Sequence, residues 1–273
     1  MNRVEDLIVY GKKHLHSHHA KILLSNLLGL NPLELLNHLE QEVSEDLIEN
    51  YEKQVEALKE NKPIQYVIGK VNFYGNDFIV NEKVLIPRFE TEQLVENTIS
   101  YINEMFNDNV KIIDLGTGSG CIGLTLKSKL PNAEVTLLDI SKEALEVAKL
   151  NASNLGLEVN FILNDMLENI NNKYDVIISN PPYIGEGEDL EELVKNNEPS
   201  IALYGGVDGL ECYKKILKNI KRNLNEKYLI AFEIGKNQGE EVKLLIEEHL
   251  ENVEVIIKED YQEKARMVFA YRK

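Results

Sequence analysis

Apolar residues in the first part of the chain recur at helical spacing. One face of an α-helix carries residues three or four positions apart, and this spacing is shown by Val4, Leu7, Ile8 and Leu15. A longer stretch of the same kind follows Ser44, a residue type that favours the position just before a helix. No strand-like alternation interrupts this region. We therefore expect residues 1–62 to form a small bundle of about four or five helices.

The pattern changes at Pro63. Beyond it come short runs rich in β-branched and aromatic residues, at residues 67–69 and 71–80, and both runs lie around Gly75-Asn76. Asn and Gly are residues that tight hairpin turns favour. The sequence therefore predicts a β-hairpin linker over residues 63–86.

From residue 87 onward, apolar runs of strand length alternate with helical patterns. The predicted strands are 110–114, 134–139, 159–163, 174–179, 229–234, 253–257 and 267–271. Buried strands separated by helices are typical of an α/β fold with a mostly parallel sheet that is covered on both faces. We expect residues 87–273 to form one such domain.

Composition excludes several classes of protein. The 273 residues are 43% hydrophobic and 28% charged, as in a packed globular domain. No apolar run approaches the ~20 residues of a membrane helix, and the first ten residues lack a signal-peptide core, so no membrane partner is expected. Cys121 and Cys212 lack the spacing of metal ligands, which favours a reducing cytoplasm.

Two charge patterns bear on possible ligands. The net charge of −16 disfavours a protein that grips phosphates, so we expect no direct DNA binding. Four histidines lie close together near the start of the chain, at His14, His16, His18 and His19. Because no acid or cysteine is interleaved with them, we interpret them as a solvated helix end and predict no metal site.

A glycine-rich segment follows the first strand of the predicted sheet. It runs from Asp114 through Gly116, Thr117, Gly118 and Ser119 to Gly120. Glycines here let the backbone turn tightly and approach a ligand closely, although a plain turn would also use them. The acid before them suits a ligand with a cationic amino-acid end better than a pyrophosphate. S-adenosylmethionine is such a ligand, and we expect these residues to bind it.

Acids also stand at the ends of the next two predicted strands. Asp139 ends one strand, where a carboxylate can accept hydrogen bonds from both ribose hydroxyls. Its alternative role is a helix cap, but Ser141 can cap that helix alone, which would leave Asp139 free. Asp165 and Met166 follow the next strand. There the carboxylate could accept the adenine amino hydrogen and the thioether could pack on the ring, with a simple turn as the alternative.

The segment Asn180-Pro181-Pro182-Tyr183, called here the Asn-Pro-Pro-Tyr loop, follows a buried strand. It lies at the sheet edge where α/β folds bind ligands. The prolines fix the backbone and remove two N–H donors, so the loop presents acceptors: the Asn180 side-chain oxygen and the Pro181 carbonyl. Tyr183 could stack on a planar group. The alternative is a rigid loop without chemistry.

Such acceptors suit a planar nitrogen that carries two hydrogens. The lone pair of an amide nitrogen is delocalised into its carbonyl, and acceptors aimed at its hydrogens return electron density to the nitrogen. The remaining catalysis is positioning for in-line methyl transfer. An exocyclic base amine poses the same problem, so a DNA adenine-N6 or cytosine-N4 methyltransferase is an alternative. That enzyme would have to extrude a base and grip phosphates.

These motifs resemble those of class I S-adenosylmethionine-dependent methyltransferases, and among them the HemK/PrmC family of protein-glutamine methyltransferases. The resemblance covers nearly the whole chain and is most specific at residues 86–92, 114–121, 180–184, 198–203 and 205–210. It implies a Rossmann-like sheet with a small N-terminal helical bundle and a hairpin linker. Two departures, Phe89 in place of a proline and a glycine-free segment at 261–266, put partner contacts in doubt.

The resemblance also implies a substrate. The family methylates the glutamine of the Gly-Gly-Gln loop in class 1 peptide chain release factors, and the Asn-Pro-Pro-Tyr loop would bind that side chain. Arg88, Glu90 and Thr91 would lie near the pocket and help to close it, although acids there also suit a helix start. Alternatives are a ribosomal-protein glutamine methyltransferase and a binding module without turnover. We expect the N-terminal bundle to recognise the substrate protein.

Overall fold

The computed structural model describes residues 2–107 and 109–273, which form two compact units. The first, called here the helical unit, comprises the chain through Lys70 together with Glu191–Asn197. The second, the α/β unit, comprises Val71–Leu190 and Glu198–Lys273. The predicted domain boundary at residue 62 lies between two helices of the helical unit. In the part of the chain that the model describes, no helix is long and apolar enough to cross a membrane.

The helical unit packs around one apolar core. Its elements are α1 (Val4–His14), α2 (Ser17–Leu28), η1 (Glu34–His38), α3 (Glu45–Lys59), α4 (Ile64–Ile68) and α8 (Glu192–Asn197). Leu7, Leu23 and Val55 are fully buried in this core, one from each long helix. Tyr51 is buried beside them and donates its hydroxyl to the Ala20 carbonyl at 3.0 Å.

The histidine cluster lies at a helix start. The His16 ring accepts a hydrogen bond from the His18 backbone N–H and so caps α2. Among residues 2–107 and 109–273, no group of three His, Cys, Asp or Glu side chains could hold a metal ion.

The linker differs from the predicted hairpin in two details. Residues 67 and 68 end helix α4, because Pro63 precedes its first turn and Gly69 ends it in the left-handed region at φ 81°. The hairpin that follows consists of β1 (Lys70–Phe73) and β2 (Asn76–Ile79), and its turn is Tyr74-Gly75 rather than Gly75-Asn76. Both turn residues have positive φ, as a two-residue hairpin turn of type I′ requires.

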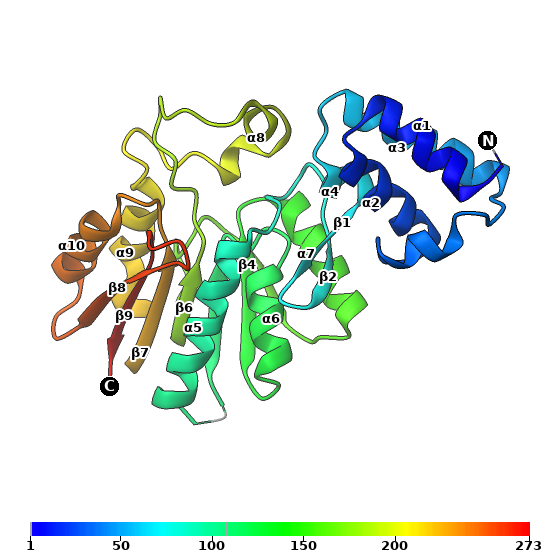
Figure 1. The fold of residues 1–273 in the computed structure, drawn as a ribbon. Helices are drawn as coiled ribbons and strands as arrows, with labels where there is room; N and C mark the ends of the chain where they lie inside the picture. The colour runs from blue at the N-terminus through cyan, green and yellow to red at the C-terminus, as the bar shows by residue number, and fades with distance from the viewer. Residues whose placement is uncertain (1, 108) are drawn as a thin grey trace. The chain divides into compact units, whose positions relative to one another are not determined.

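The α/β unit is built on a seven-stranded sheet in the order β5-β4-β3-β6-β7-β9-β8 (Figure 1). Its strands are β3 (Lys111–Leu115), β4 (Glu134–Asp139), β5 (Asn160–Leu163), β6 (Tyr174–Ser179), β7 (Leu224–Glu233), β8 (Glu254–Glu259) and β9 (Ala265–Arg272). The strands from β5 to β7 are parallel, and β9 pairs antiparallel with both β7 and β8. The predicted α/β fold class, with a mostly parallel sheet, is therefore confirmed.

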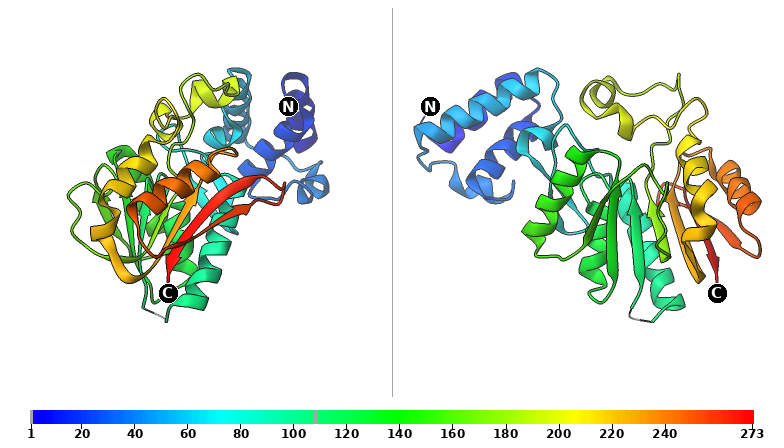
Figure 2. Two further views of the ribbon diagram at one scale, coloured as in Figure 1. Left: turned by 90° about the vertical axis from the view of Figure 1, so that its left-hand side faces the viewer. Right: turned by 180° about the vertical axis from the view of Figure 1, so that it is seen from behind.

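Helices cover both faces of the sheet, as Figures 1 and 2 show. One face packs against α5 (Phe89–Met105), α6 (Cys121–Lys129) and α7 (Lys142–Leu155), and the other packs against α9 (Glu211–Asn223) and α10 (Gly239–His249). Each face therefore has its own apolar core, which explains why the parallel strands are almost continuously apolar. The hairpin joins the first core through Phe73 and Phe78.

Candidate active site

The predicted site residues meet at one edge of the sheet. In the strand register Leu115 pairs with both Leu138 and Ser179, and Ser179 pairs with Phe232. These strands run in the same direction, so the loops that follow β3, β4, β6 and β7 emerge side by side. This carboxyl edge is where open α/β sheets bind ligands.

A pocket of about 250 Å³ lies at this edge. Seven predicted site residues line it: Gly116, Gly118, Asp139, Asp165, Met166, Asn180 and Pro182. The remaining predicted residues, Asp114, Thr117, Ser119, Gly120, Pro181, Tyr183, Arg88 and Glu90, do not line it. They surround or support the pocket, and their contacts show how.

The glycine loop, residues 116–120, is held from below by Asp114. One carboxylate oxygen, Oδ2, accepts the Thr117 hydroxyl at 2.5 Å and the Gly123 N–H at 3.0 Å. Gly116 and Gly118 have positive φ, and a Cβ on Gly118 would meet no atom within 4 Å. The loop therefore leaves open space where side chains would otherwise stand.

Asp114 itself is completely buried, and burial raises its pKa to about 7. Its second oxygen, Oδ1, has no hydrogen-bond partner among the described residues. A buried oxygen without a partner is costly. Asp114 therefore fixes the shape of the loop through its hydrogen bonds. Its burial makes the carboxyl group harder to ionise.

Asp139 is not free, contrary to the expectation that Ser141 would leave it so. Its Oδ2 accepts the Gly118 N–H at 2.8 Å, and its Oδ1 accepts the Ser141 N–H at 2.9 Å. The Ser141 hydroxyl does cap α7, by accepting the Ala144 N–H. Burial raises the pKa of Asp139, and these two backbone bonds lower it. Each oxygen keeps a lone pair, so the carboxylate can still accept from a ligand in the pocket.

The pocket wall at Asp165 contains a partner that sequence reasoning missed. Lys215 on α9 donates to Asp165 at 2.8 Å and raises its own pKa through that bond. Met166 stands in the left-handed region at φ 44°, and the Asn164 side chain donates to its carbonyl. The strained Met166 backbone is thus stabilised locally, and its side chain joins the pocket wall.

The Asn-Pro-Pro-Tyr loop is held at both ends. Asn180 donates its Nδ2 group to the Thr91 hydroxyl at 3.2 Å, and Gln238 donates its own side-chain amide to the Tyr183 carbonyl at 2.9 Å. Two glycines allow the neighbouring chain to pack against this backbone. A Cβ on Gly205 would lie 2.4 Å from the Pro182 carbonyl oxygen, and one on Gly209 would lie 2.3 Å from the Tyr183 carbonyl oxygen. No side chain larger than hydrogen fits there.

Tyr183 packs into the second apolar core rather than lining the pocket. Burial raises the pKa of its phenol to about 12, so the hydroxyl stays protonated at neutral pH.

Arg88 forms an ion pair with Glu198 at 2.5 Å, and Glu198 also accepts the Ile86 N–H at 3.1 Å. Glu198 is 6% exposed and precedes Pro199, which lines the pocket. Arg88 therefore fastens the strand-to-helix segment before α5 to one wall of the pocket. Glu90 is half-buried and lies outside the lining.

Glu233, at the carboxyl end of β7, was missed from the sequence. It is 2% exposed, its Oε2 has no partner among the described residues, and burial raises its pKa to about 7. The signal was present, since an acid ends this apolar strand just as acids end the strands at Asp114 and Asp139.

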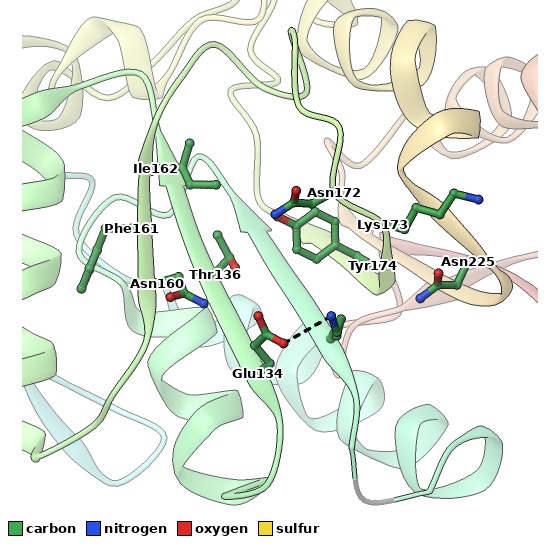
Figure 3. Close-up of a pocket in the computed structure, with 10 residues that line it drawn as sticks. Glu134, Thr136, Asn160, Phe161, Ile162, Asn172, Lys173, Tyr174 and Asn225 are labelled. Atoms are coloured by element: carbon green, nitrogen blue, oxygen red, sulfur yellow. Dashed lines mark ion pairs between the residues drawn. The ribbon is translucent and has the colours of Figure 1, made fainter.

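A larger pocket, of about 790 Å³, lies at the opposite edge of the sheet (Figure 3). Its lining comes from the amino ends of the strands and includes Lys111, Glu134, Asn160, Tyr174 and Asn225. No predicted site residue lies there, and Lys111 and Glu134 pair across it at 3.5 Å. Pocket volume is therefore a poorer guide to the chemistry than position on the sheet.

The comparisons with known proteins agree with this geometry. Residues 90–197 match the family model of the methyltransferase small domain, and residues 12–69 match that of the PrmC N-terminal domain. A release factor glutamine methyltransferase of Bacillus subtilis is 42% identical over 92% of this chain and 90% of its own length. This chain belongs to the release factor glutamine methyltransferase family. The family member of Bacillus cereus is 41% identical over 92% of this chain and 91% of its own length.

Solved structures show the same fold. A methyltransferase from Pyrococcus furiosus has a TM-score of 0.53 and 18% identity over 81% of this chain and 98% of its own length. A 16S rRNA methyltransferase from Thermus thermophilus, solved with S-adenosylmethionine and guanosine, has a TM-score of 0.54 and 15% identity over 75% of this chain and 50% of its own length. The predicted resemblance is thus confirmed, and the protein is an enzyme of the S-adenosylmethionine-dependent class.

The pocket residues fit that methyl donor. The glycine loop leaves open space at Gly118, and the Asp139 carboxylate at the pocket wall retains acceptor capacity for hydroxyl groups. The apolar lining beside it consists of Leu138, Ile140, Ala144 and Met166, which suits a flat purine.

Proposed function

We propose that this enzyme methylates the side-chain amide nitrogen of the glutamine in the Gly-Gly-Gln motif of class 1 peptide chain release factors. The observation that carries the proposal is the Asn180 carboxamide, which lines the pocket while its Nδ2 group is bound to Thr91. Family relatives at 41% and 42% identity are named for release factor glutamine methylation. Release factors act in translation, so we also propose a cytoplasmic location.

Pocket residues are assigned to the methyl donor as follows. Gly116 and Gly118 hold its amino-acid end, Asp139 holds its ribose, and Asp165 with Met166 contacts its adenine. Asp114, Thr117, Ser119 and Gly120 act through the loop, by keeping its backbone in the shape that leaves the pocket open. When bound, S-adenosylmethionine supplies an electrophilic methyl group on a sulfonium centre.

The Asn-Pro-Pro-Tyr loop activates and orients the substrate amide. Because Asn180 donates through Nδ2 to Thr91, its Oδ1 is left to accept one amide hydrogen. The Pro181 carbonyl accepts the other, and the adjacent Tyr183 carbonyl is already occupied by Gln238. These two acceptors draw electron density onto the nitrogen and fix its direction of attack. Once methylated, the nitrogen is strongly acidic, so its proton passes to solvent water past the neighbouring acceptor oxygen, and no separate general base is required.

The surrounding residues keep this arrangement rigid. Arg88 holds the pocket wall through Glu198, and Glu90 adds negative charge beside the loop. Tyr183 contributes through its packing in the second apolar core, which anchors the end of the loop. Pro182 lines the pocket and removes an N–H that would compete for the acceptors.

The proposed function is tested by a methyl-transfer assay with labelled S-adenosylmethionine. Purified release factor, total ribosomal protein and unmethylated duplex DNA are offered side by side, and the product is mapped by mass spectrometry. We expect label on the glutamine of the Gly-Gly-Gln motif. Label only on a ribosomal protein or on DNA would refute the proposed substrate.

Asn180 gives the first residue-level prediction. Asn180→Ala should lower kcat by about 10²-fold or more, because it removes an acceptor aimed at the reacting nitrogen. S-adenosylmethionine affinity, measured by calorimetry, should remain within about threefold, since other residues form most of the pocket wall. The control is Asn225→Ala at the opposite sheet edge, which removes a bond to Asp175 and should leave kcat unchanged. Equal kcat values for the two variants would contradict the mechanism.

We further propose that the helical unit recognises the release factor as a folded protein. It contains the segment that matches the PrmC N-terminal domain, and it has a core separate from that of the α/β unit. Three large apolar side chains, Val9, Leu33 and Leu36, are at least half exposed on it. A partner that covered these side chains would bury their apolar area on binding.

A further inference from the structure

Asn180 can act as an acceptor only in one of two orientations. A carboxamide carries an acceptor oxygen on one side and a donor NH₂ on the other, and the two orientations have nearly the same shape. The orientation with Oδ1 toward the substrate gives an acceptor for the amide hydrogens. In the flipped orientation the Asn180 NH₂ group would face the NH₂ group of the substrate, and both are donors. Something in the protein must therefore select between them.

Thr91 is the first part of that selection. It lies in the first turn of α5, is 2% exposed, and accepts the Asn180 Nδ2 group at 3.2 Å. A hydroxyl has a single hydrogen to donate. Because its oxygen accepts from Asn180, the Thr91 hydrogen is available for a second partner.

Glu233 is placed to be that second partner. Ser179 pairs in register with Phe232, so Asn180 and Glu233 come next on neighbouring strands, and both Thr91 and Asn180 favour the ionised form of its buried carboxyl group. A carboxylate can only accept, so it fixes the direction of every bond that reaches it. A Thr91 hydroxyl directed at this carboxylate donates to it, and Asn180 then presents its NH₂ group to this side of the loop.

Thr91 stands on a helix, Glu233 stands on a strand, and Asn180 directly follows a strand. Glu233 ends β7, where it pairs in register with Met267, and its own carbonyl accepts the Tyr213 hydroxyl at 2.7 Å. Asn180 directly follows Ser179 at the end of β6, the neighbouring strand. Groups held by strand ends and a helix keep their geometry better than groups on mobile loops.

Charged and titratable groups surround Glu233 without breaking this arrangement. Burial raises the pKa of Glu233 to about 7, and the nearby Glu90 of α5 acts in the same direction, whereas Arg266 of β9 opposes the rise. Tyr183, Tyr213 and Cys121 face it from the loop, from α9 and from α6. Burying such an acid lowers the stability of the fold, and its position beside Asn180 suggests a functional reason for it.

We propose that Thr91 and Glu233 are positioning residues that hold the Asn180 carboxamide with Oδ1 toward the substrate nitrogen. This relay, defined as Glu233, Thr91 and Asn180, rests on the proposed role of Asn180 in methyl transfer. It is more specific than a packing role, because it requires a hydroxyl at position 91 and an acceptor at position 233.

The orientation itself is tested without activity. In ¹⁵N-labelled full-length protein, the Asn180 side-chain NH₂ signals are assigned by their loss in Asn180→Ala. Solvent exchange of these protons should be slow in the wild type and at least about tenfold faster in Thr91→Val, which keeps the shape but removes the hydroxyl. Thr91→Ser, the matched control, should restore slow exchange. Unchanged exchange in Thr91→Val would overturn the relay.

Kinetics then tests the positioning role. Thr91→Val and Glu233→Gln should lower kcat on the release factor by on the order of 10-fold to 100-fold, because misdirected groups lose much of their effect. The S-adenosylmethionine Kd should not change, and Thr91→Ser should retain kcat within about threefold. A normal kcat in Thr91→Val would overturn the positioning role. So would the finding that Thr91→Val and Thr91→Ser lose kcat to the same extent and lose melting temperature to the same extent.

The two proposals fail in distinguishable ways. If the wild-type enzyme leaves the release factor unmethylated, the proposed function is wrong, while the exchange rates of Asn180 still decide whether the relay orients its carboxamide. If the wild type is active and Asn180→Ala is inactive, but Thr91→Val exchanges and turns over normally, the function stands and the relay is wrong.

Discussion

Three acids at the ends of parallel strands differ sharply at the scale of the residue. Asp114 lies beneath the glycine loop, Asp139 reaches the pocket, and Glu233 stands behind Asn180. The sequence predicts the first two as ligand-binding acids from their position after apolar runs. It does not show which oxygens are already occupied, because the partners come from other strands and helices. Arg88 with Glu198 and Asp165 with Lys215 illustrate the same limit.

The buried Asp114 gives a prediction on pH dependence. Its pKa is raised from 3.8 to about 7 by burial, so the folded protein keeps a proton that the unfolded chain releases in this range. The folded state then binds more protons, and the contribution of Asp114 to stability falls as pH rises from about 4 to 7. Asp114→Asn cannot ionise, and its amide oxygen can still accept from Thr117 and Gly123.

We therefore expect the free energy of unfolding of Asp114→Asn, relative to the wild type, to increase from pH 4.5 to pH 7 by at least about 1 kcal/mol. Urea denaturation at several pH values measures it. Glu233 is present in both proteins, so its titration cancels in the difference. A difference between the two proteins that is constant with pH would show that Asp114 is ionised in the folded state throughout.

At the scale of the element, the regular strands and long helices were predictable and the connections were less so. Apolar runs flanked by helical patterns place every strand of the sheet, because burial on both faces leaves a strong signal. Helix α4 was misread as strand-like, since a five-residue run of mostly apolar residues has no measurable period. The hairpin turn shifted by one residue because Tyr74 adopts a positive φ that its side chain does not favour.

The segment 205–209 gives a prediction about how one connection supports another. Gly209→Ala should lower kcat by about tenfold or more, because its Cβ would stand 2.3 Å from the Tyr183 carbonyl oxygen and displace the Asn-Pro-Pro-Tyr loop. Gly156→Ala is the control. Gly156 has a similar positive φ of 65°, but a Cβ there meets no atom within 4 Å.

Both variants should lose about 1 kcal/mol of stability from backbone strain, and Gly209→Ala should lose more because its Cβ also meets backbone atoms, as denaturation would show. Only Gly209→Ala should lose activity. If the two variants kept equal kcat values, the close packing of this segment would have no part in supporting the loop.

At the scale of the whole molecule, the pocket and the proposed recognition surface belong to different units. The α/β unit contains every residue of the pocket, and the helical unit contributes none. The sequence predicted this division from the change of pattern at Pro63, although contacts place the boundary between Lys70 and Val71. The sequence could not predict the surface that contacts the proposed release factor substrate. One chain alone shows which residues are exposed but not which of them a partner covers.

Leu33 and Leu36 test the recognition role of the helical unit. They are 80% and 50% exposed, so replacing both with serine should leave the fold intact. We expect the KM for whole release factor to rise by about tenfold, while the KM for a short glutamine peptide stays unchanged. Leu244→Ser on α10, where the leucine is 57% exposed, serves as the control. A similar rise for whole factor and peptide, or for the control, would contradict the assignment.

Asn180 turns its Nδ2 group to Thr91, which leaves its Oδ1 as an acceptor toward the substrate, and the two prolines of the loop have no N–H to donate. A glutamine that has hydrolysed to glutamate offers only oxygens, which the acceptors of the loop would repel. A deamidated release factor would therefore not be methylated. A glutamine that already carries one methyl group has a single N–H left and can satisfy only one acceptor. The same loop that admits the unmodified side chain thus favours departure of the product and limits the reaction to one methyl group per glutamine.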